Sequence, residues 1–289
     1  MTRPPPAVRI ATCLVLPEAD PDEAPLDAAL AAAGVTAARV AWDDPAADWD
    51  APIPTLLRTP WNYPLAPAAF LAWLDRAAAA APLINPLDVV RDNLHKRYLL
   101  ALAARGVPVV PTTLVERGQT CELAAFAAPS IVIKPEIGAS SLATRRFAPG
   151  DPAALAHLAA ITTHGAALIQ PYVASVDGHG ERALVWIDGE LSHAVRKAPR
   201  FTGDDEHIDG PFAIADDERA VACAALAPIA DRILYGRVDL ARDAAGQPMV
   251  MELELLDPSL YFVHCPGSAD RFAAALRRHL AVLPAARPR

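Results

Sequence analysis

The sequence lacks the features that mark several large classes of protein. Its cysteines form no C-x-x-C pair and have no histidine at zinc-ligand spacing, so we expect packed free thiols; they are Cys13, Cys121, Cys223 and Cys265. No apolar run reaches membrane-spanning length without a Pro, a Gly or a charge. The run at residues 10–16 is too short for a signal sequence and reads as a buried strand. These absences predict a cytoplasmic protein that does not enter a membrane.

An excess of basic residues is also absent. Lys and Arg number 26 against 34 Asp and Glu, which gives a formal net charge of −8. A nucleic-acid partner requires a basic surface, so we do not expect one. The 289 residues, 53% of them hydrophobic, are enough for two or three domains. We find no internal repeat.

Short apolar strands alternate with helical patterns in the first part of the chain. Strands are predicted at residues 10–16 and 56–58, and a further strand is predicted to end at residue 42. Helices are predicted at residues 26–34, ended by Gly34, and at 67–80, opened by Pro67. This βαβ order predicts a first α/β domain at residues 1–88. The overall class is α/β with α+β character.

The rest of the chain predicts two further domains, at residues 89–177 and 178–289. Helices are expected at 89–104, 216–234 and 269–280, and another is capped by Asp151 with Pro152 at its first position. A strand at 131–133 leads into Lys134. Asp188 and Gly189 have the composition of a hairpin turn, and a second hairpin turns near residues 245–246.

The segment "VMELELLDPS" places acidic residues at alternate positions of a strand. Glu252 and Glu254 should point to one face, and Met251, Leu253 and Leu255 to the other. A solvated edge strand would explain this pattern.

The hairpin favours a metal site over a solvated edge. Counting outward from its turn brings Asp239 opposite Glu252, with Arg237 on the same face. Clustered carboxylates cost several kcal/mol if left unpaired, and their hard oxygen atoms suit Mg²⁺.

Lys134 ends a buried strand and precedes a loop of small residues, Gly138 to Ser141. A buried lysine requires an anionic partner, and such a loop lets backbone N–H groups approach an anion. The pattern favours a phosphate site, although it is not a P-loop and a solvated lysine remains the alternative. The polar loop at residues 200–212 fits either a mobile lid or an ordinary surface loop.

These elements in this order resemble the ATP-grasp superfamily over residues 86–265. The resemblance rests on Lys96 in the predicted helix, Lys134, a hinge at residues 170–173, "GRVD" and "MELEL". Within the superfamily, "RTPWNYPL", "INPLDVVRDNLHKRYLLAL", "KPEIGASS" and "ELELLDPSLYF" resemble glutathione-synthetase-like proteins, and most closely the cycloserine-synthesising O-ureido-serine cyclo-ligase group. An ATP-grasp fold behind an N-terminal Rossmann-like domain, and a ligase of EC class 6.3, are implied.

The resemblance also implies roles for individual residues. Phosphate and nucleotide binding falls to Lys96, Lys134, Ser140, Ser141, Gln170, Tyr172, Val173 and Lys197, and two Mg²⁺ to Asp239, Glu252 and Glu254. Catalytic arginines would be Arg237, Arg196 and Arg182, and the substrate would contact Arg58, Trp61, Tyr63 and Ser259. The loop of Arg58 and Trp61 can equally be a surface loop with a packed Trp. Glu254 stands where many relatives have Asn, which leaves its role less defined.

The implied reaction is ATP-dependent activation of a carboxylate as an acyl phosphate, followed by attack of a nitrogen. Ring closure of O-ureido-D-serine to D-cycloserine is favoured, with an amino-acid-like small molecule as substrate. An intermolecular ligase, a non-catalytic ATP-binding module and phosphotransfer to another acceptor remain alternatives. A homo-oligomer is compatible, because dimers and tetramers are common among similar proteins.

Overall fold

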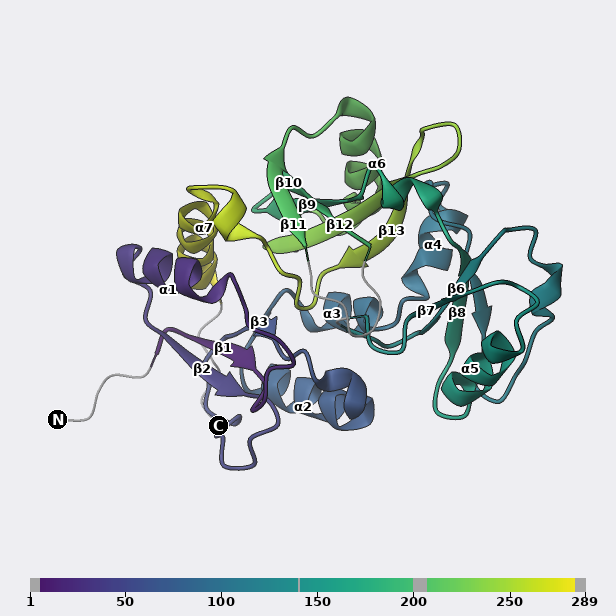
Figure 1. The fold of residues 1–289 in the computed structure, drawn as a ribbon. Helices are drawn as coiled ribbons and strands as arrows, with labels where there is room; N and C mark the ends of the chain where they lie inside the picture. The colour runs from purple at the N-terminus through teal and green to yellow at the C-terminus, as the bar shows by residue number, and fades with distance from the viewer. Residues whose placement is uncertain (1–5, 140, 200–206, 284–289) are drawn as a thin grey trace.

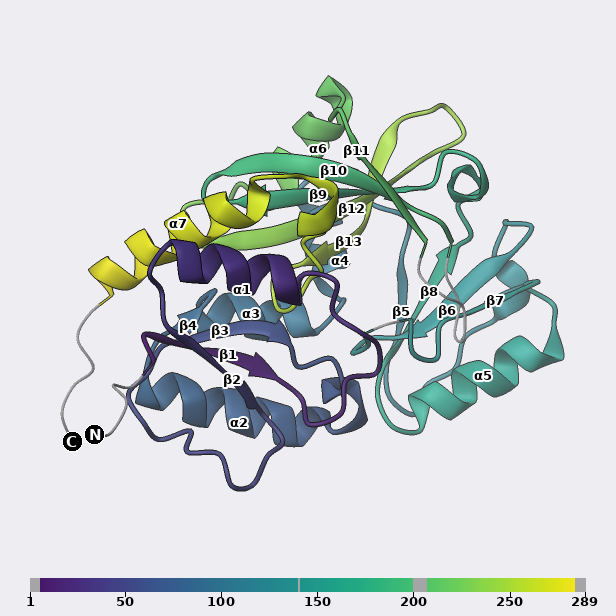
Figure 2. The same cartoon turned by 60° about the vertical axis from the view of Figure 1, so that its left-hand side comes forward.

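The computed structural model describes residues 6–139, 141–199 and 207–283, which contain a parallel N-terminal sheet and two antiparallel sheets. The N-terminal sheet has the order β2-β1-β3-β4. Its strands are β1 (Val8–Thr12), β2 (Ala37–Ala41), β3 (Thr55–Thr59) and β4 (Leu83–Ile84). Helices α1 (Glu23–Ala32) and α2 (Pro67–Ala80) lie on its opposite faces (Figure 2). The predicted βαβ opening is confirmed.

Two boundaries in this region differ from prediction. Strand β1 ends at Thr12, where its register with β2 ends, and Leu14 and Val15 beyond it are 58% and 76% exposed rather than buried. Helix α1 begins at Glu23, before the predicted start. Gly34 follows its end with φ of 71°, as expected of a helix C-terminal glycine.

The larger antiparallel sheet has the order β11-β10-β9-β12-β13. Its strands are β9 (Glu181–Ile187), β10 (Glu190–Lys197), β11 (Ile208–Phe212), β12 (Tyr235–Arg242) and β13 (Pro248–Glu254). Asp188 and Gly189 form the predicted β9–β10 turn with φ of 51° and 89°. The β12–β13 hairpin pairs Asp239 with Glu252, as predicted.

Side chains on the two faces of this sheet enter different cores. Ala183 and Val185 pack with α1 and with α7 (Ser268–Val282), which lie side by side (Figure 1). Leu184 and Val238 on the other face pack with α6 (Asp216–Leu226). The first face therefore joins the larger sheet to the N-terminal domain.

The smaller antiparallel sheet has the order β5-β8-β6-β7. It consists of β5 (Thr113–Val115), β6 (Ile131–Pro135), β7 (Arg145–Phe147) and β8 (Ala167–Pro171), and α5 (Pro152–Thr162) packs on one face. The carboxylate of Asp151 accepts a hydrogen bond from the N–H of Ala153, which confirms the predicted cap. Short 3-10 helices are η1 (Tyr63–Leu65), η2 (Leu123–Ala125), η3 (Ala174–Asp177) and η4 (Phe262–His264).

The predicted single helix at residues 89–104 is wrong. Two helices occupy the region, α3 (Leu87–Leu94) and α4 (Tyr98–Ala104). His95 is extended, with φ of −100° and ψ of 111°, and the N–H of Lys96 donates instead to the carbonyl of Glu136, at 3.0 Å. Lys96 therefore lies in a break between helices. Helix α6 also stops earlier than predicted, at Leu226, because Pro228 cannot continue it.

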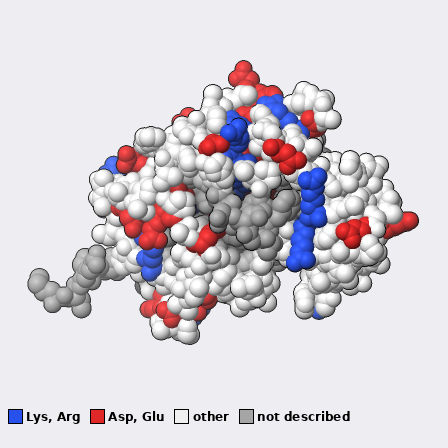
Figure 3. Space-filling view, viewed as in Figure 1, with Lys and Arg blue, Asp and Glu red and all other residues white. Residues whose placement is uncertain are grey.

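The cysteines and the surface complete the fold. All four thiols are free; Cys13 is buried, but Cys223 is exposed, contrary to the expected packing. Acidic and basic side chains are interspersed over the face in Figure 3. Within the described part of the chain, every helix is too short or too polar to cross a membrane. The boundaries near residues 88 and 177 stay a prediction.

Candidate active site

A cavity lies where the smaller sheet, the larger sheet and the N-terminal domain meet. The predicted site residues that line it are Trp61, Tyr63, Lys96, Lys134, Ser141, Gln170, Tyr172, Val173, Lys197, Arg237, Glu252, Glu254 and Ser259. Ser140 and the part of the 200–212 loop at residues 200–206 lie outside the described residues. The fold thus gathers into one site residues that are scattered along the sequence.

Lys134 is the next-to-last residue of β6 and, among the described residues, is a buried cation of this cavity without an anionic partner. It is 8% exposed, and within the described ranges its Nζ makes no hydrogen bond or ion pair. Burial, followed by the charges of Lys96 and Lys197, lowers the pKa of Lys134 to about 7, although Glu181 opposes the shift. A bound anion would relieve this desolvation.

The loop after β6 carries backbone strain beside Lys134. Ser141 and Ala143 both have φ of 55°, a region that non-glycine residues seldom adopt. Such strain is held by surrounding structure and concentrates at ligand sites. The Tyr63 hydroxyl reaches the Gly138 carbonyl at 3.5 Å, which connects the loop to the N-terminal domain.

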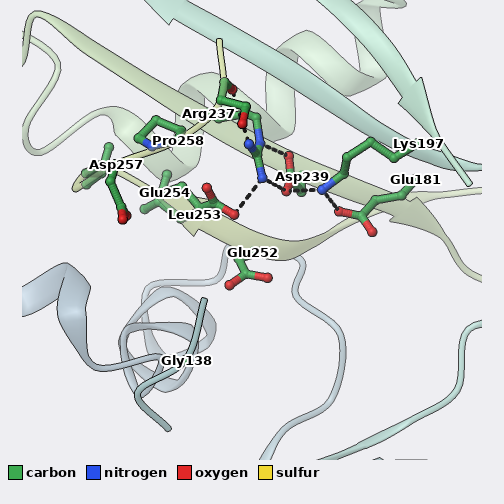
Figure 4. A network of polar contacts seen from close by, with 12 residues as sticks. Gly138, Glu181, Lys197, Arg237, Asp239, Glu252, Leu253, Glu254, Asp257 and Pro258 are labelled. Carbon is green, nitrogen blue, oxygen red and sulfur yellow. Dashed lines mark hydrogen bonds and ion pairs between the residues drawn. The ribbon is translucent and has the colours of Figure 1, made fainter. Parts of the chain in front are cut away.

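Arg237 and Lys197 hold the carboxylate of Asp239 between them (Figure 4). Arg237 donates to both carboxylate oxygens at 2.8 and 2.9 Å, and Lys197 Nζ lies 2.6 Å from Oδ2. Lys197 also lies 2.5 Å from Glu181. Burial alone would lower the pKa of Lys197, but the carboxylates of Asp239 and Glu181 outweigh it and raise that pKa. The charges balance inside the buried network.

Glu252 and Glu254 lie on β13 at the edge of this network. Glu254 accepts a hydrogen bond from Arg237 at 2.6 Å, and Glu252 forms an ion pair with Lys96. The carboxylates share a face, as predicted, while Leu253 packs in the opposite core. Met251 is an exception: the register passes from Asp239–Glu252 to Leu240–Val250, so Met251 is the extra residue of a β-bulge and lines the cavity.

The donors present fit Mg²⁺ in part. Glu252 and Glu254 present carboxylate oxygens to the cavity, the ligand type that Mg²⁺ prefers. Asp239 is 0% exposed, and both of its oxygens are already bound by cations. Residues 6–139, 141–199 and 207–283 contain no preassembled group of three His, Cys, Asp or Glu ligands. Asp239 can bind Mg²⁺ only if Lys197 releases its carboxylate. The assignment of the metal ligands stays a prediction.

The predicted adenine-binding residues border the cavity at β8. Gln170 is 4% exposed and donates to the hydroxyl of Thr112 at 2.9 Å. The Tyr172 ring lies under the guanidinium of Arg146, with 3.5 Å between Cζ and the ring centroid. Val173 follows Tyr172, beyond the end of β8 at Pro171, and also lines the cavity.

The structure does not bring Arg182 or Arg196 to the cavity. Neighbouring strand residues point to opposite faces, so Arg182 turns away from the face of Glu181, and Arg196 from that of Lys197. Arg182 pairs instead with Glu218 of α6 at 3.1 Å. Arg196 pairs with Asp209 at 2.6 Å, and its side chain is 41% exposed. The expectation that they face the reacting groups is not met.

Arg58 is likewise buried outside the cavity, at 1% exposure. It lies 3.2 Å from Asp22 and donates to the Pro258 carbonyl at 2.8 Å. Asp22 in turn accepts hydrogen bonds from backbone N–H groups of residues 260–262. The pair fixes the chain that follows β13. Trp61 supports the same segment, because its Nε1 donates to the Asp257 carbonyl at 3.1 Å.

Sequence reasoning missed three acidic residues of the cavity, Glu18, Glu181 and Asp257. Glu181 opens β9 and is identified only by its contact with Lys197. Asp257 follows β13, beyond the alternating pattern that drew attention to Glu252. Its place in "LLDPS" was the available signal, since a buried polar residue after a strand end frequently belongs to a site.

Comparisons with known proteins agree with this geometry. The family description "D-cycloserine synthetase DcsG, N-terminal domain" matches residues 8–85. The chain is 39% identical over 284 residues to the cycloserine biosynthesis protein DcsG of Streptomyces lavendulae, and the match covers 90% of this chain and 94% of that protein.

Solved structures extend the comparison to the fold. The crystal structure of D-cycloserine synthetase DcsG has a TM-score of 0.86 and 38% identity, covering 94% of this chain and 99% of that one. The ATP-grasp ligase PsnB, solved with a minimal precursor, Mg and ADP, has a TM-score of 0.62 at 17% identity, covering 97% and 99%. The D-alanine–D-alanine ligase of Bacillus anthracis has a TM-score of 0.64 at 14% identity, covering 94% and 95%. The chain therefore belongs to the D-cycloserine synthetase DcsG family of ATP-grasp ligases, enzymes of EC class 6.3.

Proposed function

We propose that the protein closes a ring in an O-ureido-D-serine-type substrate, with ATP activating the substrate carboxylate as an acyl phosphate. The observation that carries this proposal is the 39% identity over 90% of the chain to a cycloserine biosynthesis protein. The cavity supports it with a set of cations suited to two anionic reactants, namely Lys96, Lys134, Lys197 and Arg237.

Neutralising charge is the first task of such a site. ATP and a carboxylate substrate repel each other, and buried cations reduce that repulsion more effectively than exposed ones. Among the described residues Lys134 has no anionic partner that phosphate would have to displace, so it can bind phosphate directly. Lys96 and Lys197 are held by carboxylates, so they must exchange those partners for phosphate oxygens. The same exchange frees Glu252 for Mg²⁺, which when bound would neutralise phosphate charge between the reactants.

The proposed chemistry needs no covalent enzyme nucleophile. The γ-phosphoryl group passes to a carboxylate oxygen and ADP leaves. The ureido nitrogen attached to oxygen then attacks the acyl carbon, a C–N bond forms, phosphate departs with the carboxylate oxygen, and the nitrogen loses its proton to water. Arg237, 5% exposed and fixed by Asp239 and Glu254, lines the cavity where negative charge develops. Catalysis by positioning and charge stabilisation is typical of phosphoryl transfer.

The test measures ADP and phosphate release with Mg²⁺ and ATP against amino acids, amine and carboxylate pairs, and O-ureido-D-serine, with mass analysis of products. Turnover of O-ureido-D-serine alone, yielding a dehydrated ring with or without its carbamoyl group, supports the proposal. Turnover that requires separate carboxylate and amine substrates assigns an intermolecular ligase instead. ATP binding without turnover across the panel assigns a non-catalytic module, and a stable phosphorylated product assigns phosphotransfer.

Several finer features belong to the same proposal and rest on the family resemblance. They are two Mg²⁺ per site, a small amino-acid-like substrate and a homo-oligomer. The cytoplasmic location expected from the sequence is proposed as well, whereas residues 208–212 of the expected polar loop form strand β11. Titration of turnover with Mg²⁺ and sedimentation of the protein test the first and third.

A further inference from the structure

We propose that Asp257 binds the α-ammonium group of the substrate and thereby selects amino acids over other carboxylates. This inference rests on the proposed function only in taking an α-amino acid as the substrate. It concerns a residue that lies beyond the hairpin to which the ATP and metal roles are assigned.

The carboxylate of Asp257 is buried and has an oxygen without a partner. The residue is 9% exposed and lines the cavity, and its Oδ2 has no hydrogen-bond partner within the described ranges. In Figure 4 the side chain points away from the Arg237–Asp239–Lys197 network, and no hydrogen bond or ion pair joins it to the other residues drawn. A buried polar oxygen without a donor is costly, so a ligand donor at this position would stabilise the complex.

The other acidic residues near the hairpin already have cationic partners. Glu181 binds Lys197, Glu252 binds Lys96, and Glu254 binds Arg237. Asp257 makes no such ion pair within residues 6–139, 141–199 and 207–283. A cationic ligand that enters the cavity can therefore bind Asp257 without displacing a cationic side chain of the described residues.

The surroundings of Asp257 prepare it for a cation. Its backbone carbonyl accepts the Trp61 indole N–H at 3.1 Å, which fixes the chain and leaves the carboxylate for a ligand. Burial of Asp257, followed by the nearby charge of Glu254, raises the pKa of its carboxyl well above the usual range. An ammonium group would reverse that shift. Burial raises the pKa of the Tyr63 hydroxyl, and the nearby charge of Asp257 raises it further. Trp61 and Tyr63 line the same cavity as Asp257.

The position suits an α-amino acid rather than a longer amine. In such a molecule one carbon atom separates the ammonium group from the carboxylate. The residue that binds the ammonium group must therefore lie beside the phosphoryl-transfer site. Asp257 follows Glu254 closely in the chain, and both line the cavity with Arg237. An ammonium at Asp257 would thus leave the substrate carboxylate near Arg237.

The experiment measures ligand affinity by calorimetry in the presence of Mg²⁺ and a non-hydrolysable ATP analogue. It compares O-ureido-D-serine with 3-(ureidooxy)propanoate, which lacks only the amino group, in wild type and Asp257→Asn. We expect wild type to prefer the amino acid by about tenfold or more, the value of a buried charge-assisted hydrogen bond. Asp257→Asn should reduce that preference to below about threefold while binding the nucleotide normally. Asp231→Asn, the same change at an exposed position, is the matched control.

The outcomes separate this inference from the proposed function. If wild type binds neither ligand, both fail together; if wild type prefers the amino acid and Asp257→Asn retains that preference, only this inference fails. An increased Mg²⁺ requirement with unchanged preference assigns Asp257 to the metal and also overturns it. Should Asp257→Asn not bind nucleotide, Asp257→Ser, which leaves room for water, replaces it in the same comparison.

Discussion

Asp239 and Glu252 stand directly opposite each other on the β12–β13 hairpin, yet different cations hold their carboxylates. Asp239 is bound by Arg237 and Lys197 of the larger sheet, and Glu252 by Lys96 from the break between α3 and α4. Opposed like charges destabilise a strand pair unless they are neutralised. In this cavity the cations expected to bind phosphate thus neutralise the carboxylates expected to bind metal, and binding of Mg²⁺ and ATP would exchange these partners.

Glu252→Gln tests this exchange. The substitution preserves shape but removes the negative charge, so we expect turnover to fall by at least about 100-fold while the protein still unfolds in a cooperative thermal transition. Steady-state kinetics and thermal unfolding provide the measurements. Glu122→Gln, at an exposed position outside the cavity, should behave as wild type. Near-normal turnover in Glu252→Gln would remove the metal role from this hairpin.

Lys134→Met should stabilise the ligand-free protein while abolishing nucleotide binding. The pKa of Lys134 is lowered from 10.5 to about 7 in the folded state, chiefly by burial. Between these values the unfolded chain holds more protons, so the cost of burying Lys134 is full below about pH 7 and declines as pH rises. We expect a gain in unfolding free energy on the order of a few kcal/mol near pH 6 that shrinks toward pH 10, measured by urea denaturation. A destabilised variant at low pH would contradict the unpaired charge.

Nucleotide binding should take up a proton above neutral pH. Phosphate beside Lys134 raises its pKa from about 7, so at about pH 8 the bound state holds up to about one more proton. Calorimetry in buffers of different ionisation enthalpy measures this uptake. Lys134→Arg keeps the positive charge but does not titrate in this range, and should bind nucleotide without the uptake. Equal uptake in both proteins would place the titrating group elsewhere.

Arg58→Ala should lower the free energy of unfolding. Removing this buried partner leaves Asp22, at 0% exposure, uncompensated, and breaking a buried ion pair costs about 3–5 kcal/mol. Chemical denaturation measures the loss. Arg58→Met combined with Asp22→Asn should be less destabilised than Arg58→Met alone, because no unpaired charge remains. If Arg58→Ala instead keeps its stability and raises only the KM for substrate, Arg58 contacts substrate as first expected from the sequence.

Local patterns in the sequence were sufficient to predict which carboxylates of the hairpin lie close together. The turn near residues 245–246 sets the register that pairs Asp239 with Glu252, and strand alternation puts Glu252 and Glu254 on one face. Lys134 was recognisable because a buried strand runs directly into it. These features depend on residues close in the chain, whose geometry is fixed by turn and strand stereochemistry.

Only the tertiary structure decided which face of the larger sheet lines the cavity, and hence that Lys197 faces it while Arg196 does not. It also decided the break at Lys96, made by a backbone hydrogen bond to the distant Glu136, and the unpaired carboxylate of Asp257. The physical reason is that alternation determines which residues share a face, whereas packing against α1, α6 and α7 determines where that face lies.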